Sequence, residues 1–347
     1  MFNETESPIC FILSLMVHSA FPTIQQSLDA FIDSVHHSRS ANTAKTYRDA
    51  LAAFSAVLES RGLDPCEHLP AELPEESIIW AIQAMREAAP TTERNRLTAI
   101  AQFFEYLAAE DLAEVNLPQV RLLIRQRARR PGVRLPQFPR EAIEKVLAKS
   151  NELALLPTDD HNQRLRNLRD RALLVTLADT GLRIHEACNL RRGDIDMREG
   201  RAVITGKGDR QAVVRFSTRS LRAIKDYLNA RAELDGNTGR QLSALPVFAR
   251  HDDGAGKKVK PMTTKTGRLI VDQRVKSLLA GEDEAEFADQ ITPHSFRHYF
   301  VTVVLKATGN LKLAQELARH RSIAVTQRYA HLSDDELDQG YYEIFER

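Results

Sequence analysis

Apolar residues recur at helical spacing along the first third of the chain. In the clearest case they are four, three and four residues apart: Tyr47, Leu51, Phe54 and Leu58. Residues so spaced share one face of a helix, and Gly62 ends the pattern. Comparable spacing occurs in three further segments: 23–35, 75–88 and 97–107. The pattern predicts a domain of four helices that turn their apolar faces to a common core.

The second half of the chain combines helical spacing with strand-like runs. A buried helix that Gly181 stops is predicted from four apolar positions: Leu165, Leu168, Ala172 and Val175. Three short runs rich in β-branched and apolar residues follow: 195–197, 203–205 and 211–216. A glycine-containing turn at 206–209 joins the last two runs, which therefore predict an antiparallel hairpin.

A further helix start lies near the C-terminus. Thr292 is suited to cap a helix, Pro293 fits its first position, and Gly309 ends it. Residues 151–167 include Pro157 and are interpreted as a loop. Taken together, the patterns predict a mainly α fold with a small three-stranded antiparallel sheet, divided into two domains.

Charge is unevenly distributed, although the formal net charge of the 347 residues is only +1. Residues 1–118 carry 7 Lys and Arg against 17 Asp and Glu, whereas residues 119–331 carry 40 against 24. Residues 332–347 carry 1 against 6. The basic part of the chain predicts a polyanion as its partner.

The cysteines and the N-terminal residues bear on location. The three cysteines have no C-x-x-C spacing, which indicates free thiols in a reducing cytoplasm: Cys10, Cys66 and Cys188. The apolar run 9–17 is too short to span a bilayer, and Glu4 and Glu6 precede it where a signal peptide has basic residues. We therefore expect a cytoplasmic, nucleoid-associated protein with no membrane partner.

Residues 116–140 contain no acidic residue. They carry seven arginines: Arg121, Arg125, Arg127, Arg129, Arg130, Arg134 and Arg140. A charge run taken by itself is usually a solvated face. Because this one coincides with a change of composition, we interpret 119–140 as an extended basic linker that lies against DNA phosphates. Four more basic residues, on the predicted N-terminal helices, are candidate DNA contacts: Lys45, Arg48, Arg94 and Arg96.

Six residues could together cleave a phosphodiester without a metal ion: Arg183, Lys207, His294, Arg297, His320 and Tyr329. Tyrosine supplies a nucleophile, cations neutralise phosphate oxygens, and a proton donor discharges the leaving hydroxyl. Each residue alone has an ordinary interpretation as a solvated charge or a core side chain, so their order and predicted positions carry the argument. A tyrosine, with a pKa ordinarily about 10, needs surrounding positive charge to react as a phenoxide at neutral pH.

A metal site is the competing interpretation of the two histidines His294 and His298, which are four residues apart. No nearby carboxylate or cysteine completes a tetrahedral zinc set. No Asp and Glu cluster has the spacing of a two-metal nuclease. We therefore expect no metal and no cofactor.

These motifs resemble those of the tyrosine recombinases, the phage-integrase superfamily. The matching parts are 180–186, Leu190, 193–196, 206–208, 292–298, 317–320 and Tyr329, within a similarity that covers roughly residues 23–331. The resemblance implies five segments: an N-terminal extension (1–20), a helical SAM-like core-binding domain (21–118), the basic linker (119–140), a catalytic integrase domain (141–331) and a C-terminal tail (332–347).

The resemblance also implies roles for the residues that would surround the scissile phosphate. Arg183 and Arg297 clamp its non-bridging oxygens with a bidentate geometry that lysine does not reproduce. His294 and His320 hydrogen-bond the phosphate or handle the proton of the nucleophile. Glu186 orients these side chains from behind.

For the bond changes, the resemblance implies that Tyr329 forms a 3′-phosphotyrosyl bond and that Lys207 protonates the 5′ oxygen. The covalent bond conserves the phosphodiester energy, so the strand is rejoined without ATP. One position departs from the family, which commonly has glycine immediately before the second histidine. Arg319 stands there, and it either adds a phosphate contact or crowds the turn.

The resemblance implies a site-specific recombinase that acts on double-stranded DNA with an inverted-repeat core site. A synaptic homo-tetramer, or a hetero-tetramer with a paralogue, follows from strand exchange between two duplexes. The apolar positions of the tail predict a helix that docks into a neighbouring protomer, with packing on its own domain as the alternative. Xer-like and mobile-element enzymes share these motifs, so the biological setting stays open.

Two other classes were weighed against a recombinase. Type IB topoisomerases and telomere resolvases share the chemistry but carry large extra domains or a different context for the nucleophile. A DNA-binding protein without activity would be expected to lose Tyr329 or Arg183, and both are present.

Overall fold

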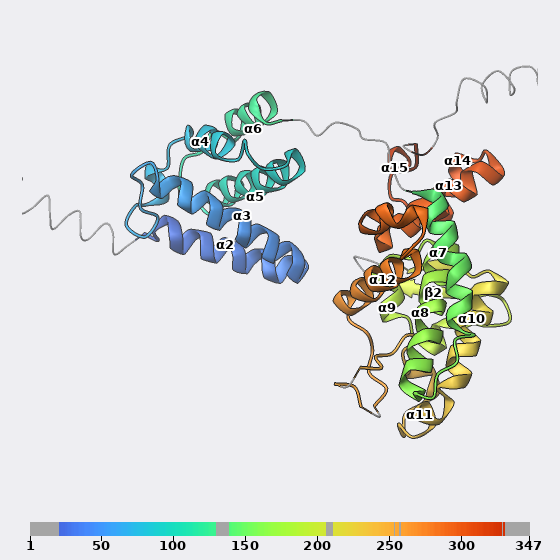
Figure 1. Cartoon of the computed structure of the whole chain (residues 1–347). Helices are drawn as coiled ribbons and strands as arrows, with labels where there is room; N and C mark the ends of the chain where they lie inside the picture. Colours follow the sequence, from blue (N-terminus) through green and yellow to red (C-terminus); the bar gives the residue numbers. More distant parts are fainter. Residues whose placement is uncertain are drawn as a thin grey trace, which may run out of the picture. The chain divides into compact units, whose positions relative to one another are not determined.

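The computed structural model describes residues 21–129, 139–205, 211–252, 254–256, 258–327 and 329. The chain divides into two compact units, Met1–Val133 and Arg134–Arg347, here called the N-terminal and C-terminal units. Each unit has a hydrophobic core of its own (Figure 1). No helix in the described part of the chain is both long enough and apolar enough to cross a membrane.

The N-terminal unit is helical, as its apolar spacing predicts. Its elements are α2 (Ile24–Ser38), α3 (Ala41–Glu59), η1 (Pro70–Glu72), α4 (Ser77–Ala84), α5 (Pro90–Ala109) and α6 (Leu117–Arg127). Thr23 caps α2 by accepting a hydrogen bond from the backbone N–H of Gln26. Phe54 of α3 and Phe104 of α5 are fully buried, with ring centroids 6.3 Å apart. The predicted faces therefore do meet in one core.

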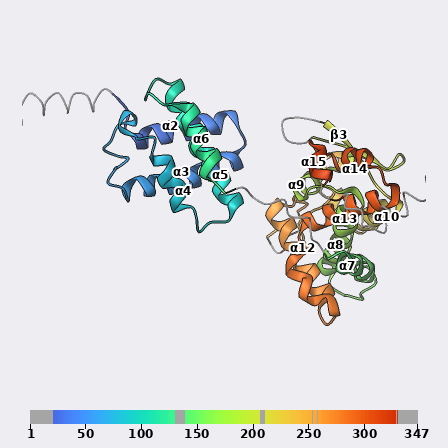
Figure 2. The same ribbon diagram turned by 90° about the horizontal axis from the view of Figure 1, so that it is seen from above.

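Helix α6 occupies the first half of the segment that was expected to be an extended linker, so that prediction is wrong for Leu117–Arg127. Asn116 caps the helix, and Val120 is 1% exposed within the core of the N-terminal unit. The helix packs on α4 and α5 (Figure 2). Apolar residues between the arginines form a stripe along the helix. Burial of this stripe stabilises the helix, although the arginines favour a solvated segment. The rest of the predicted linker, 130–138, lies outside the described residues.

The C-terminal unit is mainly helical and contains one small sheet. Its helices are α7 (Arg140–Leu153), α8 (His161–Thr180), α9 (Ile184–Asn189), η2 (Arg192–Asp194), α10 (Thr218–Ala230), α11 (Ala232–Gly236), η3 (Leu242–Ala244), α12 (Thr264–Leu279), η4 (Asp283–Gln290), α13 (Pro293–Thr308), α14 (Leu311–Ala318) and α15 (Ile323–Gln327). Its strands are β1 (Ile195–Asp196), β2 (Arg201–Thr205) and β3 (Gln211–Arg215), in the order β1-β2-β3. Both pairs are antiparallel, and Ala202 faces Ile195 on one side and Val214 on the other. The predicted three-stranded sheet is thereby confirmed.

Helix α8 is the central element of this unit and packs against α7, α10 and α13. It begins at His161, so the loop expected over 151–167 covers only the residues between α7 and α8. Asp160 caps α8 by accepting from the backbone N–H of Asn162, and buried Leu165 anchors its first turns. It ends at Gly181, whose φ of +58° is left-handed. A side chain at Gly181 would lie 2.5 Å from the ring of Phe300, so this turn can hold only glycine.

Candidate active site

The predicted catalytic residues that the structure describes come from four places in the C-terminal unit: the α8–α9 junction, the start of α13, the α14–α15 turn and Tyr329. A pocket of about 620 Å³ opens where the first two meet. Arg183, His294 and Arg297 line it, and α12 contributes Arg268 and Asp272. Cations from segments that are far apart in sequence thus share one cavity.

Arg183 is held at the mouth of this pocket by Glu186. The Arg183 backbone N–H donates to Glu186 Oε2 at 2.8 Å, and Arg183 Nη1 donates to Oε1 at 2.9 Å. The Arg183 side chain is 43% exposed, whereas that of Glu186 is 3% exposed. Burial by itself would raise the pKa of Glu186, but the Arg183 hydrogen bonds and the charge of Arg319 hold it below its ordinary value. Glu186 is therefore an ionised, buried support for Arg183.

Arg297 lies beneath the pocket and is almost fully buried. Its guanidinium donates to the carbonyl oxygens of Gly181 and Ala318, which join α13 to the end of α8 and to the α14–α15 turn. Burial, followed by the charges of Arg183 and Arg319, lowers the pKa of Arg297 to about 9. The side chain therefore still carries its charge at neutral pH, in a site with excess positive charge.

Three histidines line the approach to Tyr329. The rings of His294 and His298 are 4.2 Å apart, one turn apart on α13. His298 Nδ1 is hydrogen-bonded to the Tyr329 hydroxyl, and the centroids of these two rings are 5.3 Å apart. The ring of His320 stacks on Tyr329 at 6.4 Å, while its Nδ1 pairs with Thr326 Oγ1 at 2.8 Å.

The histidines are kept neutral by their surroundings. Burial, followed by the charges of His294 and Arg297, lowers the pKa of His298 to about 4. Burial, followed by Arg297 and Arg183, lowers the pKa of His320 to about 4 as well. The pKa of His294 is lowered in the same direction by burial and by Arg297. Neutral imidazoles can accept a proton or a hydrogen bond at physiological pH.

Arg319 does not reach toward the pocket as the sequence allowed. Its guanidinium points inward to the carbonyls that end α8 and to Glu186, and the side chain is only 11% exposed. The predicted phosphate contact is therefore not made from this position.

Several predicted residues lie outside the described part of the chain. They are Lys207, Arg130, Arg134, the extension 1–20 and the tail 332–347. Within the described residues, no three His, Cys, Asp or Glu side chains gather as a metal ligand set, so His294 and His298 have no third partner of that kind.

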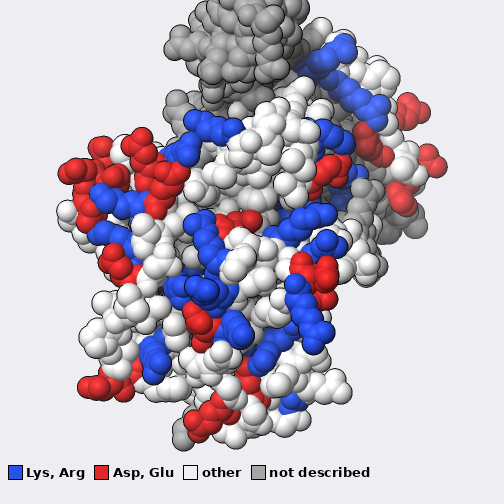
Figure 3. All heavy atoms as spheres, turned by 90° about the vertical axis from the view of Figure 1, so that its right-hand side faces the viewer, with Lys and Arg blue, Asp and Glu red and all other residues white. Residues whose placement is uncertain are grey.

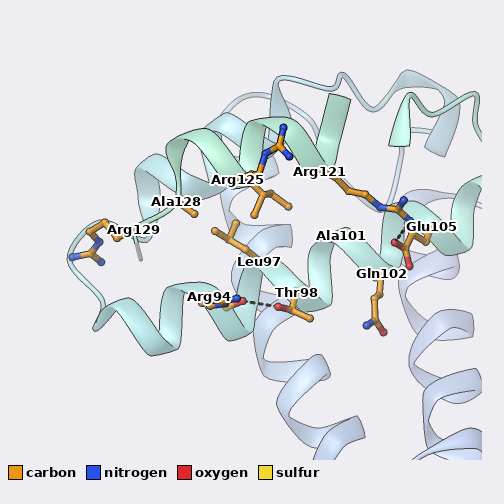
Figure 4. A pocket seen from close by; sticks show the side chains of 11 residues that line it. Arg94, Leu97, Thr98, Ala101, Gln102, Glu105, Arg121, Arg125, Ala128 and Arg129 are labelled. Atoms are coloured by element: carbon orange, nitrogen blue, oxygen red, sulfur yellow. Dashed lines mark hydrogen bonds and ion pairs between the residues drawn. The ribbon is translucent and has the colours of Figure 1, made fainter. Parts of the chain in front are cut away.

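Some of the predicted DNA contacts of the N-terminal unit line a groove of about 410 Å³ between α5 and α6 (Figure 4). Arg94, Arg121 and Arg125 line it, and Arg121 is paired with Glu105 at 2.7 Å. Lys45 and Arg48 are exposed on α3, Arg127 is exposed on α6, and Arg96 is half-buried on α5.

Arg129 differs from its neighbours because its guanidinium is already bound within the unit. Its Nε pairs with Glu93 Oε2 at 2.6 Å, and its Nη2 donates to the carbonyls of Ala88 and Met85. The Glu93 side chain has no exposed surface. Arg129 is therefore placed as a structural partner of Glu93.

The charged side chains do not form one uninterrupted basic surface on the face in Figure 3. There, Lys and Arg side chains gather in several patches, with Asp and Glu side chains between them. A phosphate on that face would therefore meet particular cations more than a uniform positive field.

Two residues of the site were missed or misread from sequence. His298 was considered only as a zinc ligand, although its place one turn after His294 on the same helix face was a signal that it faces the same site. Arg319 was noted as unusual, but no local pattern indicated that it points inward. Both depend on contacts between distant segments.

The chain is similar in sequence to known proteins. Residues 145–336 match the model of the phage integrase family. Tyrosine recombinase XerC of Myxococcus xanthus is 30% identical over 254 residues, 73% of this chain and 75% of that protein. XerC of Treponema denticola is 27% identical over 86% of this chain and 91% of its own length.

Solved structures show the same fold at low identity. The XerH recombinase bound to its difH substrate has a TM-score of 0.62 at 17% identity, covering 98% of this chain and 90% of that one. A lambda integrase dimer bound to a core site has a TM-score of 0.58 at 17% identity, covering 89% and 95%. The chain therefore belongs to the phage integrase family and is a tyrosine recombinase.

Proposed function

We propose that this recombinase cuts and rejoins double-stranded DNA at a specific site through a covalent bond between Tyr329 and a 3′ phosphate. The observation that carries the proposal is that His298, the hydrogen-bond partner of the Tyr329 hydroxyl, lies against His294 of the pocket. Arg183 and Arg297 line that pocket, and His320 stacks on the ring of Tyr329. This arrangement can bind a phosphodiester, accept the phenolic proton and stabilise the charge that develops in the transition state.

The arginines suit the two non-bridging oxygens of the phosphate. A guanidinium has five N–H donors, and two of those on Arg297 serve the carbonyls of Gly181 and Ala318. Three donors remain for the substrate. Arg183 is braced by Glu186 but partly exposed, so it can close on the same phosphate from the pocket mouth.

The bond changes balance with the residues of this site. Tyr329 Oη attacks phosphorus while its proton passes to the imidazole of His298, and the bond from phosphorus to the 5′ oxygen breaks. The leaving oxygen takes a proton from Lys207, whose role comes from the family resemblance. The reverse attack by a 5′ hydroxyl releases Tyr329. Because the phosphotyrosyl ester keeps the energy of the phosphodiester, neither ATP nor a metal ion is required.

The partner of this activity is double-stranded DNA with an inverted-repeat core. XerH is a site-specific recombinase bound to its difH substrate, and the similar Tn1549 transposon integrase is bound to transposon right end DNA, which supports DNA as the substrate class. Exchange between two duplexes requires four coordinated active sites. We therefore assign the active form to a tetramer assembled on DNA.

The test is covalent trapping on a nicked suicide duplex that carries the cognate site. The substrate would be identified from inverted repeats in the DNA that flanks the gene. We expect the full-length protein to form an adduct in EDTA, visible as a slow band in denaturing gels. Tyr329→Phe should bind the duplex with unchanged affinity and form no adduct, because only the hydroxyl is lost.

An adduct formed by Tyr329→Phe would mean that another residue is the nucleophile. Loss of the adduct in EDTA, with recovery on adding Mg²⁺, would overturn the metal-independent part of the proposal.

A further inference from the structure

Arg319 holds a backbone conformation that disfavours its side chain. Its φ of +58° and ψ of +44° are left-handed, and within the described residues only Asp111 shares a positive φ without being glycine. The left-handed region is unfavourable for a non-glycine residue, because its Cβ approaches the following carbonyl oxygen. A glycine would meet no such cost at this turn. An arginine in this conformation therefore points to a compensating contribution from its side chain.

The side chain reaches four acceptors inside the protein. Nη1 donates to the carbonyls of Thr180 at 3.4 Å and Leu317 at 3.2 Å. Nη2 donates to the carbonyl of Gly181 at 3.2 Å and to Glu186 Oε2 at 3.3 Å. One guanidinium therefore joins the turn before His320 to the end of α8 and to the support of Arg183.

These acceptors are shared with both arginines that we assign to the phosphate. The Gly181 carbonyl also accepts from Arg297, and Glu186 also accepts from Arg183. Arg297 donates in addition to the carbonyl of Ala318, the residue before Arg319. Three guanidinium groups are thus arranged around one carboxylate and one carbonyl, with Arg319 on the buried side.

We propose that Arg319 is a positioning residue that sets the spacing between Arg183, Arg297 and His320 without contacting DNA. The inference rests on the proposed function, because that spacing matters only if these residues act on one phosphate. If Arg319 served only the fold of this turn, glycine could replace it without loss of folding or of cleavage. The proposal predicts instead that the guanidinium itself is needed for cleavage.

Two substitutions separate these roles. Arg319→Gly relieves the backbone and leaves a guanidinium-sized gap beside the acceptors, whereas Arg319→Met keeps most of the aliphatic volume and fills that gap. Both remove the charge and the hydrogen bonds. We expect each variant to bind the nicked duplex with unchanged Kd and to form the covalent adduct at least tenfold more slowly than wild type in single turnovers at saturating protein.

Chemical rescue supplies the decisive readout. Millimolar guanidinium chloride, compared with sodium chloride at equal ionic strength, should restore at least a threefold increase in rate to Arg319→Gly. The same addition should leave Arg319→Met unchanged, because its side chain occupies the gap. Tyr329→Phe should remain inactive in both salts.

Adduct formation by folded Arg319→Gly at the wild-type rate would overturn the proposal, and so would a slow Arg319→Gly that guanidinium does not accelerate. If Arg319→Gly is unfolded by circular dichroism, Arg319→Met decides: a folded Arg319→Met with the wild-type rate also overturns it. Failure of the proposed function can be told apart from failure of the Arg319 proposal, because in the first case the wild-type protein itself would form no adduct through Tyr329.

Discussion

At the scale of single residues, the hydroxyl of Tyr329 is held by an imidazole that the sequence motif does not single out. His298 Nδ1 is its hydrogen-bond partner, and burial with the charges of His294 and Arg297 lowers the pKa of His298 to about 4. The ring is therefore neutral across the physiological range and, in the proposed mechanism, can accept the phenolic proton of Tyr329. Only below about pH 4 would protonation remove this acceptor.

Replacing this acceptor should slow cleavage without weakening binding. We expect His298→Gln to form the adduct about 100-fold more slowly at pH 7, the lower end of what a positioned general base contributes. Its rate should rise steadily from pH 7 to pH 9 as the phenol ionises on its own, whereas the wild-type rate should change less. Single-turnover rates of His298→Gln and wild type, measured from pH 7 to pH 9, give the pH dependence of each protein.

Two controls make the His298 result specific. His161→Gln, at the exposed start of α8, should leave the rate unchanged. A substrate with a 5′-bridging phosphorothiolate needs no protonation of its leaving group, so it compensates for the loss of a general acid. We expect His298 to act on the nucleophile instead, so this substrate should not restore the cleavage rate of His298→Gln. Full restoration by that substrate would show that His298 serves the leaving group instead.

At the scale of elements, the periodic spacing of apolar residues predicted which helix faces are buried, because burial of a face requires that spacing. The faces around Phe54 and Phe104 lie where their spacing places them, because a helix that buries one stripe must repeat it every three or four residues. Helix α6 was missed because its arginines suggested a solvated linker, although Val120 lies in the core. The active site could be predicted by residue type and order, but the inward direction of Arg319 depends on carbonyls 138 and 139 residues away.

The arginines of α6 and its end should divide into two functional kinds. Arg129→Ala leaves the fully buried carboxylate of Glu93 without its partner, so we expect it to destabilise the N-terminal unit by about 3 kcal/mol. Arg125→Ala, on the exposed side of the same groove, should leave stability unchanged. It should instead reduce the log–log salt dependence of DNA binding by about one.

Urea unfolding and salt titrations of the full-length variants would test this division. Equal stability of Arg129→Ala and wild type would mean that the Glu93 pair is not structural. An unchanged salt slope for Arg125→Ala would place its guanidinium away from phosphate.

At the scale of the whole molecule, the two units have separate cores and should respond differently to acid. Four buried or half-buried histidines with lowered pKa values lie in the described part of the C-terminal unit: His251, His294, His298 and His320. Burial, followed by the charge of Arg169, lowers the pKa of His251 to about 3. Glu93 of the N-terminal unit has a lowered pKa too, but a carboxylate loses its contribution only below about pH 4.5.

Acidification from pH 7 to pH 5 should therefore destabilise the C-terminal unit selectively. An unfolded histidine binds its proton near pH 6.5, whereas folded His251, His298 and His320 do so near pH 3 to 4, so the stability present above pH 6.5 is lost as the pH falls. Each histidine contributes a slope of up to about 1.4 kcal/mol per pH unit. Calorimetry of the full chain should show one transition moving to lower temperature while the other stays.

His251→Gln is the matched control, because glutamine keeps an acceptor for the buried Tyr227 hydroxyl that His251 Nε2 meets at 2.7 Å. In His251→Gln, unfolding of the C-terminal unit should take up about one proton fewer, so its transition temperature should depend less on pH. Two transitions that shift together, or an unchanged slope in His251→Gln, would contradict this account.

Tyr329 packs on a small satellite cluster formed around Val301 and Ala314, apart from the main core of its unit. The fold of that unit is therefore largely independent of its nucleophile. A gene in which the Tyr329 codon specifies phenylalanine would encode a protein that keeps Arg183, Arg297 and His320 and, on the proposed function, still occupies recombination sites, yet cannot cut them. Produced alongside the intact protein, such a product would enter shared assemblies as a dominant-negative subunit.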